Sequence, residues 1–215
     1  MNVKDGKFAQ RLRMSISFAW NIFTEKVGTG MIPINKEASM QLHDASILLQ
    51  VVPLICYEES EHVKVELETG IEINGKRRGI DLILCGSNSK SGSTYRIAVE
   101  MKCYRTLASS GNDRGATNYF MRDVYEDLSL LEAYYTQANF DRGIALVMTD
   151  KEALVNPMKK EGKCWDYDIS QGTKISDVLI QTKIRKEDFD VRLLKSYEFD
   201  WIKKGQFWFL ESEGH

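Results

Sequence analysis

Residues Gly79–Lys102, GIDLILCGSNSKSGSTYRIAVEMK, are the stretch from which the fold of this chain can be predicted. The sequence predicts two strands here, Gly79–Cys85 and Tyr95–Lys102, because each is rich in Ile, Leu or Val. The intervening residues 86–94, GSNSKSGST, consist almost entirely of Gly, Ser, Asn and Thr, which favour turns and loops. We therefore expect a β-hairpin that closes through a polar loop.

The register of this hairpin follows from its length. If the strands are antiparallel and Asp81 faces Glu100, the turn is centred between Lys90 and Ser91, within the polar loop. The period-two alternation of a strand places Glu100 and Lys102 on the same face. Side chains opposed in such a ladder lie about 5 Å apart at Cβ. The natural pairing therefore brings two carboxylates and one ammonium group together.

This combination of side chains predicts a metal site. Two carboxylates at such a spacing repel each other and raise each other's pKa unless a cation lies between them. Carboxylate oxygens suit Mg²⁺ or Mn²⁺. The ammonium group of Lys102 beside the metal could orient a water molecule or stabilise charge that develops on a phosphate. Charged groups beside residues as apolar as Ile80–Leu84 are also costly to bury unless they are paired or bound to metal.

The order Asp81, 18 intervening residues and Glu100-Met101-Lys102 resembles the motif of the PD-(D/E)XK nuclease superfamily. The resemblance covers roughly residues 36–150, and Ile80 stands where the motif has proline. It implies an α/β protein of the restriction-endonuclease-like fold: an αβββαβ core with a central mixed sheet flanked by helices, to which this chain adds C-terminal strands. The structural alternative is a surface hairpin with a Glu–Lys pair, against which the apolar first strand argues.

The resemblance also implies an activity. The expected enzyme is a Mg²⁺-dependent (or Mn²⁺-dependent) phosphodiesterase that leaves 5′-phosphate ends, with DNA preferred over RNA and an endonuclease over an exonuclease. Asp81, Glu100 and Lys102 would be catalytic, and Asp81, Glu100 and the Met101 carbonyl would bind the metal. The layout of the C-terminal region is similar to that of small bacterial members of the superfamily that accompany restriction or phage-defence systems. This similarity implies a role in restriction or phage defence. The alternative is a non-catalytic nucleic-acid-binding or protein-interaction subunit that keeps the fold, although the complete Asp, Glu and Lys set argues against it.

Further polar residues could serve this site. By the same resemblance, a helix predicted at 36–56 would contribute an acid, either Glu37 or Asp44, with Gln41 and Gln50 as polar alternatives. Each of the two acids could equally be an ordinary residue of the helix surface. The candidate phosphate ligands are basic residues near the predicted strand ends: Lys76, Arg77, Arg78, Arg105 and Arg114. The triplet at 76–78 is equally consistent with a charged edge that protects a hairpin.

The remaining elements are predicted from periodicity and composition. They are helices at 7–26 and 118–138, a doubly buried strand at 143–149, and shorter strands at 62–67, 71–73, 191–194, 197–201 and 206–210. The dipeptide Asn74-Gly75 predicts a hairpin turn before the Asp81 strand. Within the predicted helices, Leu54 and Tyr135 are expected on buried faces. Asp123, Glu126 and Asp127 are expected to face solvent, although in the resembled fold this helix borders the active site and often bears a polar residue near it.

Composition bounds the class of protein. A chain of 215 residues predicts one domain, with a helical extension at 1–35, a nuclease-like core at 36–150 and a strand-rich extension at 151–215. A net charge of −2 argues against a histone-like binder that relies on charge alone. Four widely spaced cysteines and three histidines argue against zinc and favour free thiols. Without a signal peptide or a long apolar run, we expect a cytoplasmic protein with no membrane partner. A homodimer would suit double-strand cleavage.

Overall fold

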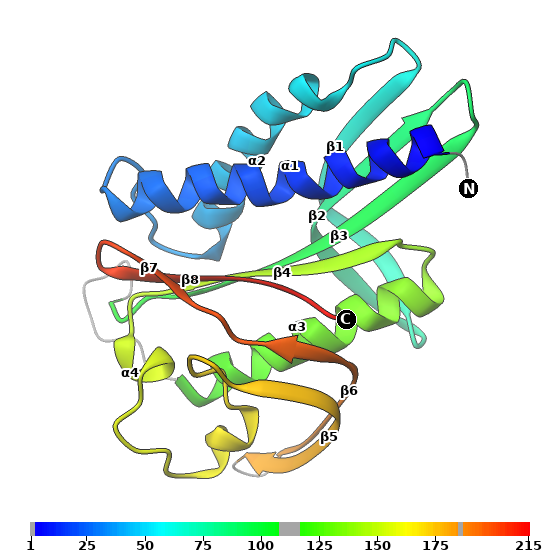
Figure 1. The fold of residues 1–215 in the computed structure, drawn as a ribbon. Coiled ribbons are helices and arrows are strands. Elements are labelled where there is room, and N and C mark those ends of the chain that lie inside the picture. The colour runs from blue at the N-terminus through cyan, green and yellow to red at the C-terminus, as the bar shows by residue number, and fades with distance from the viewer. Residues whose placement is uncertain (1–2, 108–116, 185–186) are drawn as a thin grey trace.

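The computed structural model of the protein describes residues 3–107, 117–184 and 187–215 (Figure 1). Within these ranges, six strands form a central mixed sheet in the order β1-β2-β3-β4-β8-β7. β3 and β4 are parallel, and every other neighbouring pair is antiparallel. The strands are β1 (Glu61–Ile73), β2 (Lys76–Asn88), β3 (Ser93–Tyr104), β4 (Arg142–Thr149), β7 (Ile202–Lys204) and β8 (Phe207–Glu213).

Helices cover both faces of the sheet, which gives the molecule the layered architecture of an α/β protein (Figure 1). α1 (Val3–Gly28) and α2 (Glu37–Ile55) pack on one face, and α3 (Thr117–Gln137) packs on the other. A separate antiparallel pair, β5 (Lys174–Ile184) and β6 (Glu187–Glu198), lies beyond α3. Two short helices, α4 (Glu152–Val155) and the 3-10 helix η1 (Lys163–Tyr167), lie in the connection between β4 and β5. The predicted central mixed sheet flanked by helices is confirmed.

Both predicted turns are present. Asn74 and Gly75 close the β1–β2 hairpin with positive φ angles of 51° and 71°, which Asn and Gly tolerate better than other residues. Residues 89–92 form the turn between β2 and β3, centred between Lys90 and Ser91 as predicted. The β2–β3 ladder pairs Leu82 with Val99, so its register continued by one step places Asp81 opposite Glu100.

An apolar core lies on each side of the sheet. In β4, Ile144, Leu146 and Met148 pack toward α1 and α2, whereas Ala145 and Val147 pack toward α3. This strand is buried on both faces, as its continuous apolar sequence predicts. The described part of the chain contains no helix long and apolar enough to cross a membrane. All four cysteines lie in the described ranges and are free thiols.

Several strand predictions were wrong. β1 is one continuous strand rather than two pieces, and β5 was not predicted at all. Residues 199–201 of the predicted strand at 197–201 are not in a strand. β8, which corresponds to the predicted strand at 206–210, lies between β4 and β7 rather than at an edge of the sheet, and its Phe207 and Phe209 rings are buried. Strand order depends on pairing between distant segments, which local periodicity does not encode.

Two predictions of helix burial were also wrong. Leu54 is 70 % exposed and lines a groove between α1 and α2. Tyr135 is exposed, and its neighbour Tyr134 is buried in its place. The buried stripe of α3 continues from Leu131 to Tyr134, three residues on, whereas the prediction continued it to Tyr135, four residues on. Residues three or four apart lie on the same face of a helix, so the sequence allowed either.

Candidate active site

Asp81 lies where the β2–β3 ladder ends. The last pair of this ladder is Leu82–Val99, and beyond it Asp81 Oδ2 accepts a hydrogen bond of 2.6 Å from the backbone N–H of Met101. The β1–β2 ladder also lacks a pair at Asp81, and Glu68 on β1 has a left-handed backbone there (φ 51°). The Asp81 carboxylate therefore accepts the hydrogen bond that a backbone carbonyl of a neighbouring strand would otherwise accept from the Met101 N–H of β3. Burial raises the pKa of Asp81, although the Met101 N–H and Lys102 act in the opposite direction.

Glu100 is the most deeply buried acid of the site, at 5 % exposure. Its carboxyl group accepts a hydrogen bond of 2.6 Å from the hydroxyl of Tyr134 and lies within hydrogen-bonding reach of the Asp81 carboxyl group. Burial raises the pKa of Glu100 well above its ordinary value, and the charges of Asp127 and Asp81 raise it further. The charged form of the Glu100 carboxyl group is therefore disfavoured unless a cation compensates its charge.

Lys102 lies on the same face of β3 as Glu100, as predicted. Its Nζ is 3.2 Å from Asp127 Oδ2 and 3.8 Å from Glu37 Oε2. Burial alone would lower the pKa of Lys102, but the charges of Asp127 and Glu37 outweigh that effect and raise it. The ammonium group is therefore charged and held between α2 and α3, with the side chain still partly open to solvent.

Asp127 was expected to face solvent, and this prediction was wrong. Its side chain is buried against Lys102, and burial raises its pKa to about 8 against the opposing effect of the lysine. Asp127 and Tyr134 are seven residues apart, which is two turns of α3, so both reach the same side of the sheet. A signal was present in the sequence, since Asp127 lies three residues after Val124 and four residues before Leu131, spacings that place it next to the apolar stripe.

Of the two acids proposed on α2, the structure brings only Glu37 to the site. Glu37 Oε2 accepts a hydrogen bond of 3.2 Å from the backbone N–H of Cys103, and burial raises the pKa of Glu37. One turn further along, Gln41 Nε2 donates to the Asp81 carbonyl at 2.6 Å. Asp44 lies deeper in the α2 interface, where the charge that acts on it comes from Glu211 of β8. Gln50 is exposed and bonds to its own helix.

The proposed basic residues differ in their surroundings. Lys76 and Arg77 are exposed at the start of β2. Arg78 lies three residues before Asp81 and forms an ion pair of 3.5 Å with Glu126, the neighbour of Asp127, so within the triplet it is Arg78 that approaches the site. Arg105 instead bonds to Asp150 at 2.8 Å and to the Ile34 carbonyl, which ties the end of β3 to the end of β4. Arg114 lies outside the described residues.

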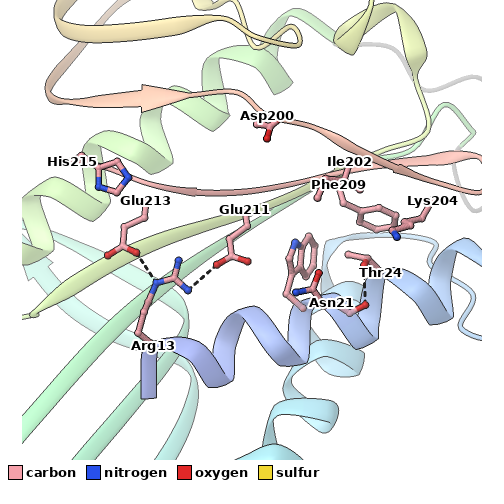
Figure 2. Close-up of a pocket in the computed structure, with 11 residues that line it drawn as sticks. Arg13, Asn21, Thr24, Asp200, Ile202, Lys204, Phe209, Glu211, Glu213 and His215 are labelled. Carbon is pink, nitrogen blue, oxygen red and sulfur yellow. Dashed lines mark hydrogen bonds and ion pairs between the residues drawn. The ribbon is translucent and has the colours of Figure 1, made fainter. Parts of the chain in front are cut away.

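A different pocket, of about 350 Å³, lies between α1 and β8 and does not include these residues (Figure 2). Arg13 bonds there to Glu213 at 2.6 Å and to Glu211 at 2.8 Å. Asp200 adds a further acid to its wall. Because its one arginine is neutralised by two glutamates, this pocket is poorly suited to a phosphate group.

No family model, curated protein or solved structure matches this chain. Any assignment of function therefore rests on the residues and their geometry.

The donor set at Asp81 and Glu100 fits a hard divalent cation. Among the described residues, no three His, Cys, Asp or Glu side chains converge as a complete metal site. Mg²⁺, however, commonly takes only one or two protein carboxylates and keeps several water molecules. The carboxyl groups of Asp81 and Glu100 lie within hydrogen-bonding reach of each other, and both have a raised pKa, so a cation would stabilise the pair in its charged form.

Proposed function

We propose that this chain is a metal-dependent nuclease that hydrolyses phosphodiester bonds, with DNA as the preferred substrate. The observation that carries the proposal is the convergence of three groups at one point of the sheet. The carboxyl groups of Asp81 and Glu100 lie within hydrogen-bonding reach of each other, and the charged Lys102 stands on the same face. The element order α2-β1-β2-β3-α3-β4 supports the restriction-endonuclease-like core that the motif implies.

Asp81 and Glu100, with the Met101 carbonyl by resemblance, would hold Mg²⁺ or Mn²⁺. The metal, when bound, would neutralise phosphate charge and lower the pKa of a water molecule. Lys102 would donate hydrogen bonds to the attacking water or to a phosphate oxygen. Tyr134 would orient the Glu100 carboxylate, and Asp127 and Glu37 would keep the ammonium group of Lys102 in place.

Substrate binding would follow from charge at the border of the site. Lys76 and Arg77 are exposed at the start of β2, five and four residues before Asp81 on the same strand, where they could contact the nucleic-acid backbone without reading its sequence. Arg105 is a weaker candidate than the sequence suggests, since Asp150 and a carbonyl already occupy its guanidinium group.

We predict that Lys102→Ala and Asp81→Asn each lower cleavage by about 10²–10⁴-fold, the range expected when one catalytic group is lost. The measurement is cleavage of plasmid, linear and single-stranded DNA, and of RNA, with Mg²⁺ or Mn²⁺. Lys64→Ala is the matched control, because Lys64 is also a strand lysine paired with a glutamate, Glu66, but lies on β1 away from the acids.

Full activity of Lys102→Ala would contradict the proposal. If the wild-type chain cleaves none of these substrates and binds no metal by calorimetry, the nuclease is excluded. The fold would then belong to a non-catalytic nucleic-acid-binding or protein-interaction subunit.

A further inference from the structure

α2 has almost no charged side chains, although its exposed side includes the polar Ser46 and Gln50. Residues 38–55, ASMQLHDASILLQVVPLI, contain one charged side chain, Asp44, and it is buried. A helix that covers a sheet normally carries charged residues on its outer side, whereas α2 presents the exposed Leu42, Leu49 and Leu54 there. In the single chain, the outer side of α2 is open.

The exposed apolar surface extends from α2 onto α1. Leu42, Leu49 and Leu54 of α2 and Met14 and Phe18 of α1 are each more than half exposed. We call these five residues the helical face. Phe18 and Leu54 also line a groove of about 520 Å³ between the two helices. These five exposed apolar side chains are grouped on two helices that pack together, as at a site of association, rather than scattered over the surface.

We propose that the helical face binds a second copy of this chain, with the two α2 helices antiparallel about a two-fold axis. The stripe Leu42, Ser46 and Leu49 would meet the same stripe in reverse, and the small Ser46 would allow close approach. The ends of α2 carry complementary charges, since the exposed Lys36 precedes the helix and the exposed Glu59 follows it. An antiparallel arrangement places each lysine near the partner's acid and also opposes the helix dipoles.

The chemistry of the face favours a protein partner over a membrane. Helices that lie on lipid surfaces carry Lys and Arg beside their apolar side. α2 has no lysine or arginine between Glu37 and Ile55, and the groove between α1 and α2 is lined by one such residue, Lys26 of α1. A second copy is favoured over an unrelated protein, because the same surface supplies both the lysine (Lys36) and the acid (Glu59) of each charge pair. Such a surface is complementary to itself.

Sedimentation velocity of the full chain tests the proposal. We expect the wild type, whose chain mass is 24.7 kDa, to sediment as a dimer at micromolar concentration and Leu49→Lys to sediment as a monomer. Leu179→Lys is the matched control, since Leu179 is 49 % exposed but lies on β5, and this variant should stay dimeric. Circular dichroism checks that each variant is folded.

Charge reversal tests the antiparallel arrangement. Lys36→Glu or Glu59→Lys alone should weaken dimerisation on the order of tenfold, because each removes two symmetry-related pairs. Both changes in one chain should restore it. A wild type that remains monomeric up to about 100 μM, where a dimer with micromolar Kd would be nearly complete, overturns the proposal. A folded Leu49→Lys variant that dimerises as tightly as the wild type also overturns it, as would a monomeric wild type that binds anionic vesicles.

Discussion

Asp44 is a carboxyl group that the fold buries without full hydrogen bonding. It is 2 % exposed, and its Oδ1 has no hydrogen-bond partner among the described residues. Burial raises the pKa of Asp44 to about 7, and the charge of Glu211 contributes to the rise. An unpaired buried polar atom costs stability, so Asp44 makes the fold sensitive to pH.

We predict that Asp44→Asn gains stability relative to the wild type as pH rises. The unfolded Asp44 has a pKa of about 3.9, so between pH 4 and 7 the folded state binds more protons than the unfolded state. The free energy of unfolding of the wild type therefore falls as pH rises through this window. The advantage of Asp44→Asn should grow by about 2–3 kcal/mol between pH 5 and pH 8.

Urea unfolding at several pH values measures this difference. Asp190→Asn is the control, since Asp190 is exposed and should show no such trend. An advantage of Asp44→Asn that does not change with pH would mean that Asp44 is charged in the folded state across the range.

α1 packs so closely on the sheet that its sequence constrains β2. Its predicted apolar stripe, Phe8, Leu12, Ile16, Trp20 and Phe23, is buried throughout. Beneath this stripe lies a glycine of β2, Gly86. A Cβ added at Gly86 would lie 2.2 Å from Leu12 Cδ1, well inside van der Waals contact. The absence of a side chain at this position is therefore what lets the helix approach.

We predict that Gly86→Ala destabilises the protein by about 1–3 kcal/mol, the usual cost of an extra methyl group in a packed core. Thermal unfolding measures the effect. Gly79→Ala is the matched control in the same strand, because its added Cβ would meet its nearest atom at 3.7 Å, an ordinary contact. Equal stability of the two variants would show that Leu12 can move aside without loss of packing.

At the scale of the whole molecule, the acids of the candidate site lower the stability of the fold, although the proposed function requires them. Asp81, Glu100 and Asp127 come from two strands and one helix. The charges of Asp81 and Asp127 raise the pKa of Glu100, and the charge of Asp81 raises that of Asp127. Lys102 compensates only part of this charge. Such clusters of like charge lower the stability of the fold and persist where a function requires them.

We predict that Glu100→Gln raises the melting temperature in EDTA and abolishes stabilisation by metal. A metal at a hundred times its Kd stabilises a protein by about 2.7 kcal/mol, which corresponds to several degrees for a chain of this size. Differential scanning calorimetry with EDTA, Mg²⁺ and Mn²⁺ makes the measurement, with Glu66→Gln on β1 as the control. Equal stabilisation of the wild type and Glu100→Gln by metal would place the cation elsewhere.

Local sequence was sufficient for much of this architecture. Three features depend only on residues that are adjacent in the sequence: the Asn74-Gly75 turn, the polar loop at 86–94 and the apolar run of β4. The turn and the loop follow from the backbone preferences of their residues, and the run follows from burial on both faces. Even the register of Asp81 against Glu100 followed from counting residues across one turn. These features involve segments close in the chain, so their geometry is contained in the order of residues.

The sequence by itself thus determined the hairpin that carries Asp81, Glu100 and Lys102, and the helices and strands on either side of it. Only the tertiary structure decided that Asp127 and Tyr134 complete the surroundings of Lys102 and Glu100, that Glu37 rather than Asp44 reaches them, and that Arg105 is already bound. The physical reason is that each of these depends on the rotation of a helix about its axis, or on a contact between distant segments. A helical stripe tolerates spacings of three or four residues, and packing against the sheet selects between them.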